Sequence, residues 1–139
     1  MMSEQTLEAP TPTTHSLDSF IVNHLTRIPL VDRIFFLDHL RTMIHAGLSL
    51  VEGLHVLGKE TQNKKLLLIV KDVTLYVEKG NQLSDALKRY PKIFPDLQTT
   101  MIASGEIAGQ LEDALEQVVV QMKKSYALTS SIKDAMIYT

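Results

Sequence analysis

The hydrophobic residues of this chain recur at three- and four-residue spacing from Ser16 onward. That spacing gathers apolar side chains on one face of an α-helix, whereas alternating polar and apolar residues would indicate a β-strand. No stretch of the chain shows convincing strand alternation. The pattern therefore predicts an all-α fold, a six-helix bundle of antiparallel helices preceded by one extra amphipathic helix.

The first thirty residues differ from the rest. Residues 1–15 are rich in Thr, Pro, Glu and Ser, which is typical of a disordered tail. Residues 16–30 are predicted to form a short amphipathic helix and a linker, because Pro29 forces the residue before it out of the helical conformation. The positions on its apolar face are Leu17, Phe20, Ile21, His24, Leu25 and Ile28. Residues 31–139 are expected to form the main helical domain.

This amphipathic segment could pack on the bundle, lie on a membrane surface or dock a partner. Only Arg27 and Arg33 are basic in its neighbourhood, which argues against strong binding to anionic lipid. Packing on the bundle or on a second copy is the favoured interpretation. Because isolated domains with apolar helix faces often pair symmetrically, a homodimer is also expected.

Residues with known capping preferences mark the ends of the first helices of the bundle. One helix is expected from Asp32, as N-cap, to about residue 46, with Gly47 after its end, where a left-handed conformation costs glycine least. Ser49 and Glu52 then have the spacing of a capping box, in which each side chain accepts from the backbone amide of the other. This box predicts the start of the next helix.

Residues 64–79 predict a fourth helix, with Asn63 at its start and Gly80 beyond its end. Its apolar residues surround the helix axis rather than forming a stripe, so it is expected to be the most buried helix.

Three more helices follow. The segment LSDALKRYP predicts a short helix capped by Ser84. Residues 94–105 predict the next, with Pro95 near its first turn and Gly105 at its end. The last helix is expected to begin near Gly109 or Gln110, to extend toward the final residue, and to carry acidic residues early and lysines later, as the helix dipole favours.

Composition and charge exclude several classes of protein. Fourteen basic and sixteen acidic residues give a formal charge of -2, without the basic stripe of a nucleic-acid binder. There is no cysteine, so neither a disulfide framework nor a cysteine zinc site is possible. The longest purely apolar run, residues 66–70, is far shorter than the ~20 residues that span a bilayer, and so are shorter runs such as 118–120.

The segment SGEIAGQL, residues 104–111, is the strongest candidate for chemistry. It lacks the Lys and Ser/Thr that follow the last glycine of a phosphate-binding loop. Acid–base catalysis would need a second acid converging on Glu106. A structural role is favoured instead, in which Gly105 adopts a positive φ angle and Gly109 allows close packing. Glu106 would accept from amides at the start of the last helix, and a partner contact is the alternative.

The histidines give no catalytic or metal-binding pattern. None of the five forms an i, i+4 pair, and no H-E-x-x-H motif occurs. His39 was considered as a phosphorelay residue, but the side chains around it are too large to leave its ring open. His45 is expected to interact with the dipole at a helix C-terminus. The residues alone therefore predict no enzyme, no metal and no cofactor.

The order of motifs resembles a known family. An aromatic-led helix with AGLSL at residues 46–50 is followed by GNQLSDAL at 80–87, a PKIFP turn at 91–95, SGEIAGQL at 104–111 and IKDAMIYT at 132–139. This order is similar to the cytoplasmic domain of the type II secretion protein F family, which includes the inner-membrane platform protein of type IV pili. The matching positions singled out as structural or partner-contact residues are Gly47, Gly80, Pro95, Gly105, Glu106, Gly109 and Leu111.

The resemblance implies a non-catalytic platform domain at the cytoplasmic face of the bacterial inner membrane. It would be a soluble piece that stops where a membrane helix of a longer protein begins. Its expected partners are a cytoplasmic hexameric assembly ATPase, other inner-membrane assembly proteins and, through the parent protein's membrane helices, pilin or pseudopilin. The alternative is a free-standing helical adaptor or phosphotransfer module.

Overall fold

The computed structural model describes the backbone of residues 28–137 and the side chains of residues 28–128. The predicted disordered tail and all of the predicted amphipathic helix except Ile28 lie outside the described residues. So do Tyr138 and Thr139 at the other end.

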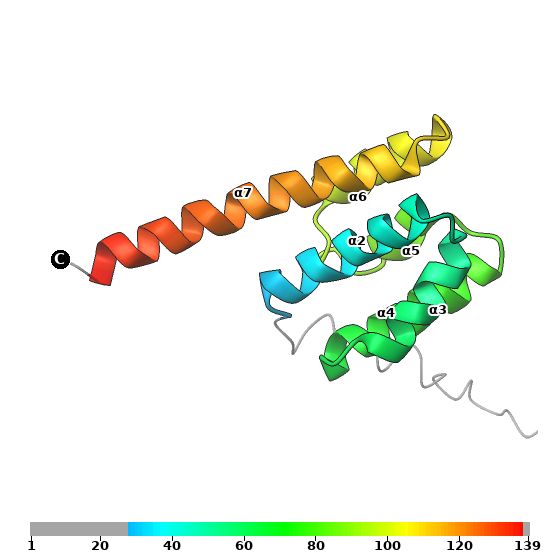
Figure 1. The fold of residues 1–139 in the computed structure, drawn as a ribbon, viewed down its shortest axis with the longest axis horizontal. Coiled ribbons are helices and arrows are strands. Elements are labelled where there is room, and N and C mark those ends of the chain that lie inside the picture. Colours follow the sequence, from blue (N-terminus) through cyan, green and yellow to red (C-terminus); the bar gives the residue numbers. More distant parts are fainter. Residues whose placement is uncertain (1–27, 138–139) are drawn as a thin grey trace, which may run out of the picture.

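The described residues contain six helices and no strand, which confirms the all-α prediction (Figure 1). The helices are α2 (Leu30–His45), α3 (Leu50–Glu60), α4 (Lys64–Glu78), α5 (Leu83–Lys88), α6 (Asp96–Ile107) and α7 (Leu111–Ile137).

Two groups of helices share one core. The α3 and α4 helices pack on each other, while α7 lies along both α2 and α6 (Figure 1). The two groups are joined by α2 against α3 and by the short α5 helix, which contacts both α4 and α6. In Figure 1, α7 extends well past the other helices at its C-terminal end. The α2 and α6 helices therefore pack along α7, and its C-terminal part projects beyond them.

The helical apolar periodicity of the sequence accounts for this core. On α2, Phe36, Leu37 and Leu40 are at most 1% exposed. The α4 helix contributes seven buried residues, more than any of α2, α3, α5 or α6, in line with its predicted burial. They are Leu66, Ile69, Val70, Asp72, Val73, Thr74 and Val77.

The buried carboxylate of Asp72 has partners in the core. Asp72 on α4 accepts a hydrogen bond from the Tyr90 hydroxyl and forms an ion pair with Arg89 at 3.0 Å. The Arg89 guanidinium also lies over the ring of Tyr76, 4.6 Å from its centroid. These contacts compensate for removing the Asp72 carboxylate from water.

Most predicted helix ends agree with the structure. The Ser49 hydroxyl accepts from the Glu52 amide at 3.2 Å, and the Glu52 carboxylate accepts from the Ser49 amide at 3.3 Å, which completes the capping box. Asn63 caps α4 by accepting from the amides of Lys65 and Leu66, both at 3.0 Å.

The prediction that Asp32 is an N-cap is wrong. The N-cap of α2 is Pro29, whose carbonyl accepts from the amides of Asp32 at 3.1 Å and Arg33 at 3.3 Å. Proline needs no amide partner of its own, so it can stand at this position and start the helix early. Asp32 lies in the first turn, where its charge still favours the helix dipole.

Arg33 fastens the start of α2 to the loop before α6. Its Nη1 donates to the Ile93 carbonyl at 3.0 Å, and burial of the guanidinium lowers the pKa of Arg33 from its ordinary value. That ordinary value is so high that the side chain keeps its charge at neutral pH.

Candidate functional site: the glycine–glutamate corner

The segment SGEIAGQL forms the corner between α6 and α7. The Gln110 amide donates to the Gly105 carbonyl at 2.7 Å, and the Gly109 amide donates to the Glu106 carbonyl at 3.3 Å. With Gly109 at a φ of +69°, these two bonds make a Schellman motif, which satisfies carbonyls left unpaired at a helix end.

Gly47 and Gly80 close their own helices in the same way. Both have a φ of +100°, and both are followed by a residue whose amide bonds back to its helix. Leu48 donates to the Met43 carbonyl at 3.0 Å, and Asn81 donates to the Tyr76 carbonyl at 3.4 Å. The glycine requirement at these positions is one of backbone angle, because a Cβ at either would meet nothing within 4 Å.

Gly105 is required for a different reason. It lies inside α6 without a positive φ, so the prediction that it adopts one is wrong. A Cβ on Gly105 would lie 2.3 Å from the Ala114 Cβ and 2.9 Å from the Gln110 carbonyl oxygen. Gly105 and Ala114 therefore allow the backbones of α6 and α7 to approach closely.

The two glycines of the corner thus have exchanged roles. The sequence pattern predicts the positive φ at Gly105 and the close packing at Gly109. In the structure Gly109 supplies the angle, and a Cβ there would meet nothing within 4 Å. The helix continues two residues past Gly105, to Ile107, which moves the turn to the second glycine.

Glu106 caps a helix that is distant in sequence. Its Oε1 accepts from the Ser84 amide at 2.8 Å, and its Oε2 accepts from the Leu83 amide at 3.0 Å. Both amides belong to the first turn of α5, so the expectation that Glu106 serves the last helix is wrong. The reason is that α5 packs on α6, which carries Glu106. The N-cap residue of α5, Gln82, makes no side-chain hydrogen bond, so the α5 amides are available to Glu106.

Ser84 is not the cap of α5, contrary to prediction. It lies inside the helix, 1% exposed, and the carboxylate of Glu106 takes over the capping role. A carboxylate that accepts two amides at a helix N-terminus is a favourable arrangement, because the helix dipole adds to two charge-assisted hydrogen bonds.

Pro95 and Leu111 were also predicted as structural or partner-contact residues, and they lie on different helices. Pro95 is the N-cap of α6, at the opposite end of that helix from the corner, and its carbonyl accepts from Gln98 at 3.0 Å and Thr99 at 3.2 Å. Leu111 is the first residue of α7 and packs, partly buried, against the core. The structure thus brings together Gly105, Glu106, Gly109 and Leu111.

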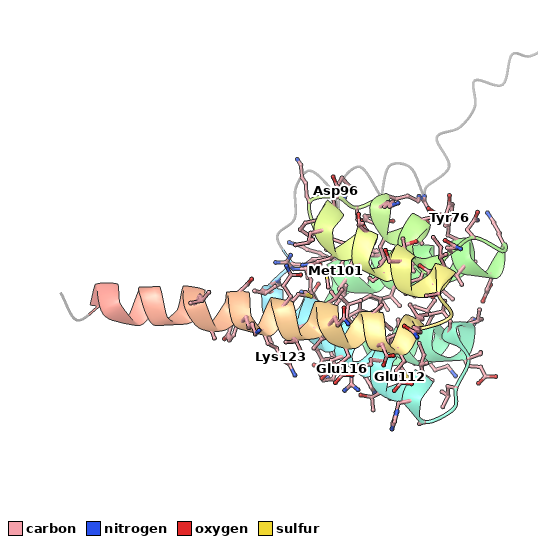
Figure 2. All side chains as sticks on the ribbon, turned by 90° about the horizontal axis from the view of Figure 1, so that it is seen from above. Tyr76, Asp96, Met101, Glu112, Glu116 and Lys123 are labelled. Carbon is pink, nitrogen blue, oxygen red and sulfur yellow. The ribbon has the colours of Figure 1, made fainter. Side chains whose placement is uncertain are left out.

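A histidine–carboxylate pair ties α2 to the corner. His45 Nδ1 lies 2.6 Å from Glu112 Oε1, in the first turn of α7. His45 lies near the C-terminus of α2, as predicted, but its partner 67 residues away was not predicted. Figure 2 shows Glu112 and Glu116 near the start of α7 and Lys123 farther along, the charge order that the dipole favours.

The surface of the corner carries one large apolar side chain. Ile107 is 80% exposed, while its neighbour Glu106 is half-buried against α5. His39, the residue weighed for phosphotransfer, packs its ring on Phe35 with centroids 5.3 Å apart and lies 3.4 Å from Glu60.

Two further findings apply to the described residues. No group of three or more His, Asp or Glu side chains there is arranged to hold a metal ion. Over the same residues, none of helices α2–α7 has the length and apolar content needed to traverse a bilayer.

Comparison with known proteins places the corner within a larger match. The family model described as Type II secretion system (T2SS), protein F, matches residues 36–139, which include the corner. The chain is 37% identical over 110 residues to the type IV pilus assembly protein PilC of Myxococcus xanthus, covering 77% of this chain and 26% of that protein.

Two other relatives show the same relation. The PilC protein of Thermus thermophilus is 36% identical over 109 residues, covering 78% of this chain and 27% of that protein. The type II secretion system protein F of Vibrio cholerae is 30% identical over 99 residues, covering 71% and 24%. The chain thus spans about a quarter of the length of the curated relatives it matches. On this evidence, the chain belongs to the type II secretion system protein F family.

Proposed function

We propose that this chain is a non-catalytic cytoplasmic domain of an inner-membrane platform protein for type IV pilus biogenesis or type II secretion. In that role it couples an assembly ATPase to the polymerisation of pilin or pseudopilin. The observation that carries the proposal is the family match over residues 36–139, together with relatives named for pilus assembly and for type II secretion.

The use of Glu106 supports an architectural role for the corner. Both carboxylate oxygens of Glu106 accept hydrogen bonds from α5 amides, and Ala114 occupies the space beside Gly105. The motif therefore fixes how α5, α6 and α7 pack on one another. A group engaged in this way is poorly placed to move a proton on a substrate. The motif residues thus support a scaffold that holds α7 at a set angle.

The partners follow from this role. They are the cytoplasmic hexameric assembly ATPase, other inner-membrane assembly proteins of the same machine, and pilin or pseudopilin through the parent protein's membrane helices. A second copy of the domain completes a homodimer at the cytoplasmic face of the membrane.

Co-purification of this chain with the assembly ATPase encoded beside it tests the proposal, together with light scattering of each protein during size-exclusion chromatography. Binding is expected, and a substitution on one face should abolish it while a matched one elsewhere does not. Ile107→Asp on the corner and Leu75→Asp on α4 change two exposed apolar residues on different helices. Absence of binding at tens of micromolar would contradict a direct coupling role for this domain.

A second comparison tests the architectural role of the corner separately. Glu106→Gln is expected to reduce thermal stability, because the NH2 group that replaces one carboxylate oxygen donates hydrogen bonds and cannot accept from an α5 amide. The architectural role would be wrong if this variant kept its helicity and melting temperature yet lost the ATPase.

A further inference from the structure

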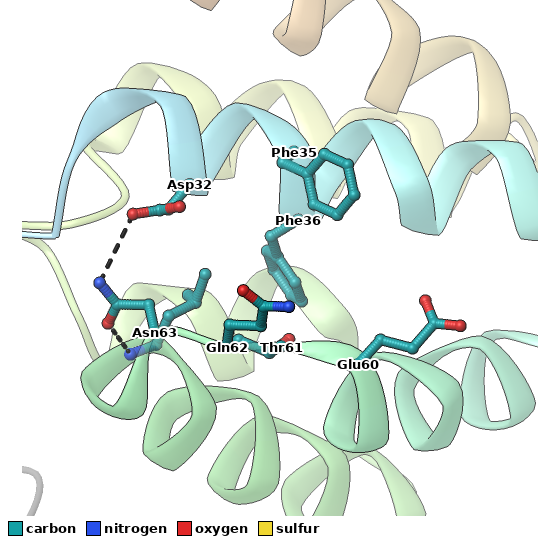
Figure 3. A pocket seen from close by; sticks show the side chains of 8 residues that line it. Asp32, Phe35, Phe36, Glu60, Thr61, Gln62 and Asn63 are labelled. Atoms are coloured by element: carbon teal, nitrogen blue, oxygen red, sulfur yellow. Dashed lines mark hydrogen bonds between the residues drawn. The ribbon is translucent and has the colours of Figure 1, made fainter.

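A hollow of about 370 Å³ opens beside the first half of α2 (Figure 3). Phe36 and Leu66 line it and are themselves buried, at 1% and 3% exposure. Asp32 and Asn63 stand at one end, joined by a hydrogen bond of 3.5 Å, and Glu60 stands at the other (Figure 3). The hollow therefore has an apolar part, formed by Phe35, Phe36 and Leu66, and a polar part, formed by Asp32, Glu60, Thr61, Gln62 and Asn63.

The wall of the hollow on α2 is unusually apolar for an exposed surface. Phe35, which lines the hollow, is 63% exposed, and Val31, one helical turn earlier, is 51% exposed. Side chains four residues apart lie on one face of a helix, so the two form a continuous apolar strip beside the opening. Covering this strip would remove a large apolar area from water, which stabilises whatever packs there.

We propose that residues 17–27 of this same chain cover the hollow. They form the amphipathic helix predicted from the sequence and turn back along α2, with the apolar face of that helix against Val31 and Phe35.

Ile28 gives the first argument, because it is the last member of the apolar face of this segment. It is 4% exposed and belongs to the hydrophobic core. Only Pro29 separates it from the first residue of α2. Ile28, the last position of that predicted apolar face, is thus already packed in the bundle at the N-terminal end of α2.

Length gives the second argument. Eleven helical residues span about 16 Å at the standard rise, and Phe35, five residues into α2, lies about 8 Å along that helix. A helix that folds back from Pro29 therefore passes the whole hollow, with its apolar positions Leu25 and Ile21 on either side of Phe35.

Charge gives the third argument. Arg27 is the one Lys or Arg between residues 16 and 28, and the edge of the hollow carries the carboxylates of Asp32 and Glu60. The segment also carries Asp18, so Asp18 and Arg27 together leave it without net formal charge, whereas the two carboxylates at the edge of the hollow repel an anionic lipid surface. The charges therefore favour the segment over a membrane as the occupant.

Cysteine cross-linking tests this proposal cleanly, since the natural chain has no cysteine. Full-length variants carry Gln62→Cys, beside the hollow, together with Ile21→Cys or His24→Cys on the apolar face of the segment. The control pairs Gln62→Cys with Ser19→Cys, on the opposite face. Under mild oxidation, the first two pairs should form an intramolecular disulfide at least tenfold faster than the control, at a yield independent of protein concentration.

A substitution in the apolar strip on α2 provides a second test of the proposal. Phe35→Asp should slow the cross-link about tenfold, while Ile107→Asp, which alters an exposed apolar residue at the corner, should leave its rate unchanged. The proposal is overturned if the cross-link forms only between molecules, which would make a second copy the occupant. It is also overturned if all three pairs react equally, or if no cross-link forms and the segment binds phosphatidylglycerol vesicles through Phe20.

Discussion

Gly105 and Gly109 stand four residues apart in one motif and are required for opposite reasons. At Gly109 the backbone has a φ of +69° and open space around the missing side chain. At Gly105 the backbone is ordinary helix, and the space is filled by Ala114 and the Gln110 carbonyl. Two glycines of one motif can therefore be required for different reasons. Substitutions at the two positions can separate a requirement for a positive φ angle from a requirement for space.

Gly105→Ala is expected to have the largest effect. Its Cβ would meet the Ala114 Cβ on α7 and the carbonyl oxygen of Gln110, the residue before α7, so the free energy of unfolding should fall by about 3 kcal/mol, at the upper end of overpacking costs. Urea unfolding followed by circular dichroism measures the loss.

Ala114→Gly provides the matched partner for this variant. It removes the contact at 2.3 Å but leaves the Gln110 oxygen at 2.9 Å, so the double variant should recover only part of the loss. A double-mutant cycle should show a favourable coupling of about 1 kcal/mol or more between the two positions. Strictly additive effects would mean that the close approach of Ala114 does not explain why position 105 requires glycine.

Glu106→Ala comes next, because it leaves the Leu83 and Ser84 amides without their acceptor. The loss should be about 2 kcal/mol, the upper range for removing a helix cap. Hydrogen exchange should quicken at the start of α5, and Glu116→Ala, on an exposed position of α7, serves as the control. Unchanged protection of the Leu83 and Ser84 amides would contradict the capping role.

Gly109→Ala is expected to cost about 1 kcal/mol, the penalty of a left-handed conformation for a residue with a Cβ. Gly109→Asn should cost about half as much, since asparagine tolerates that conformation. At Gly105 the order should reverse, with Asn worse than Ala, because size matters there. Thermal denaturation of the Ala and Asn variants at both positions measures these losses. If the same substitution is the more destabilising one at both positions, the two glycines are not required for different reasons.

Gly58→Ala should have the smallest effect, and it should be stabilising. Gly58 lies within α3, has no positive φ, and a Cβ there would meet nothing within 4 Å. Alanine is the better helix former by about 0.8–1 kcal/mol, so the midpoint of unfolding should rise. A fall would show that helix propensity does not decide this position.

Local rules recovered most of the fold from the sequence. The capping box at Ser49, the Asn63 cap and the glycines after α2 and α4 depend on residues within one turn of each helix end, which the sequence displays directly. The helical apolar spacing likewise predicted six helices close to where they lie.

The corner was less predictable because its interactions are long-range. Glu106 reaches α5 across 22 and 23 residues, and His45 reaches Glu112 across 67. Nothing in the local sequence distinguishes the first turn of α5 from that of α7 as the target of Glu106. The crowding at Gly105 likewise depends on where Ala114 lies once α6 and α7 pack, which periodicity alone does not give.

The α7 helix is also a lever. Its 27 residues make a rod about 40 Å long, which packs on α2 and α6 and has buried residues as far as Met122. Ala114, which meets Gly105, lies 23 residues before the end of this helix, so a tilt of about 10° at that contact would displace the far end by about 6 Å. A contact without room for one methyl group, together with the packing as far as Met122, therefore sets the direction in which the rest of the helix points.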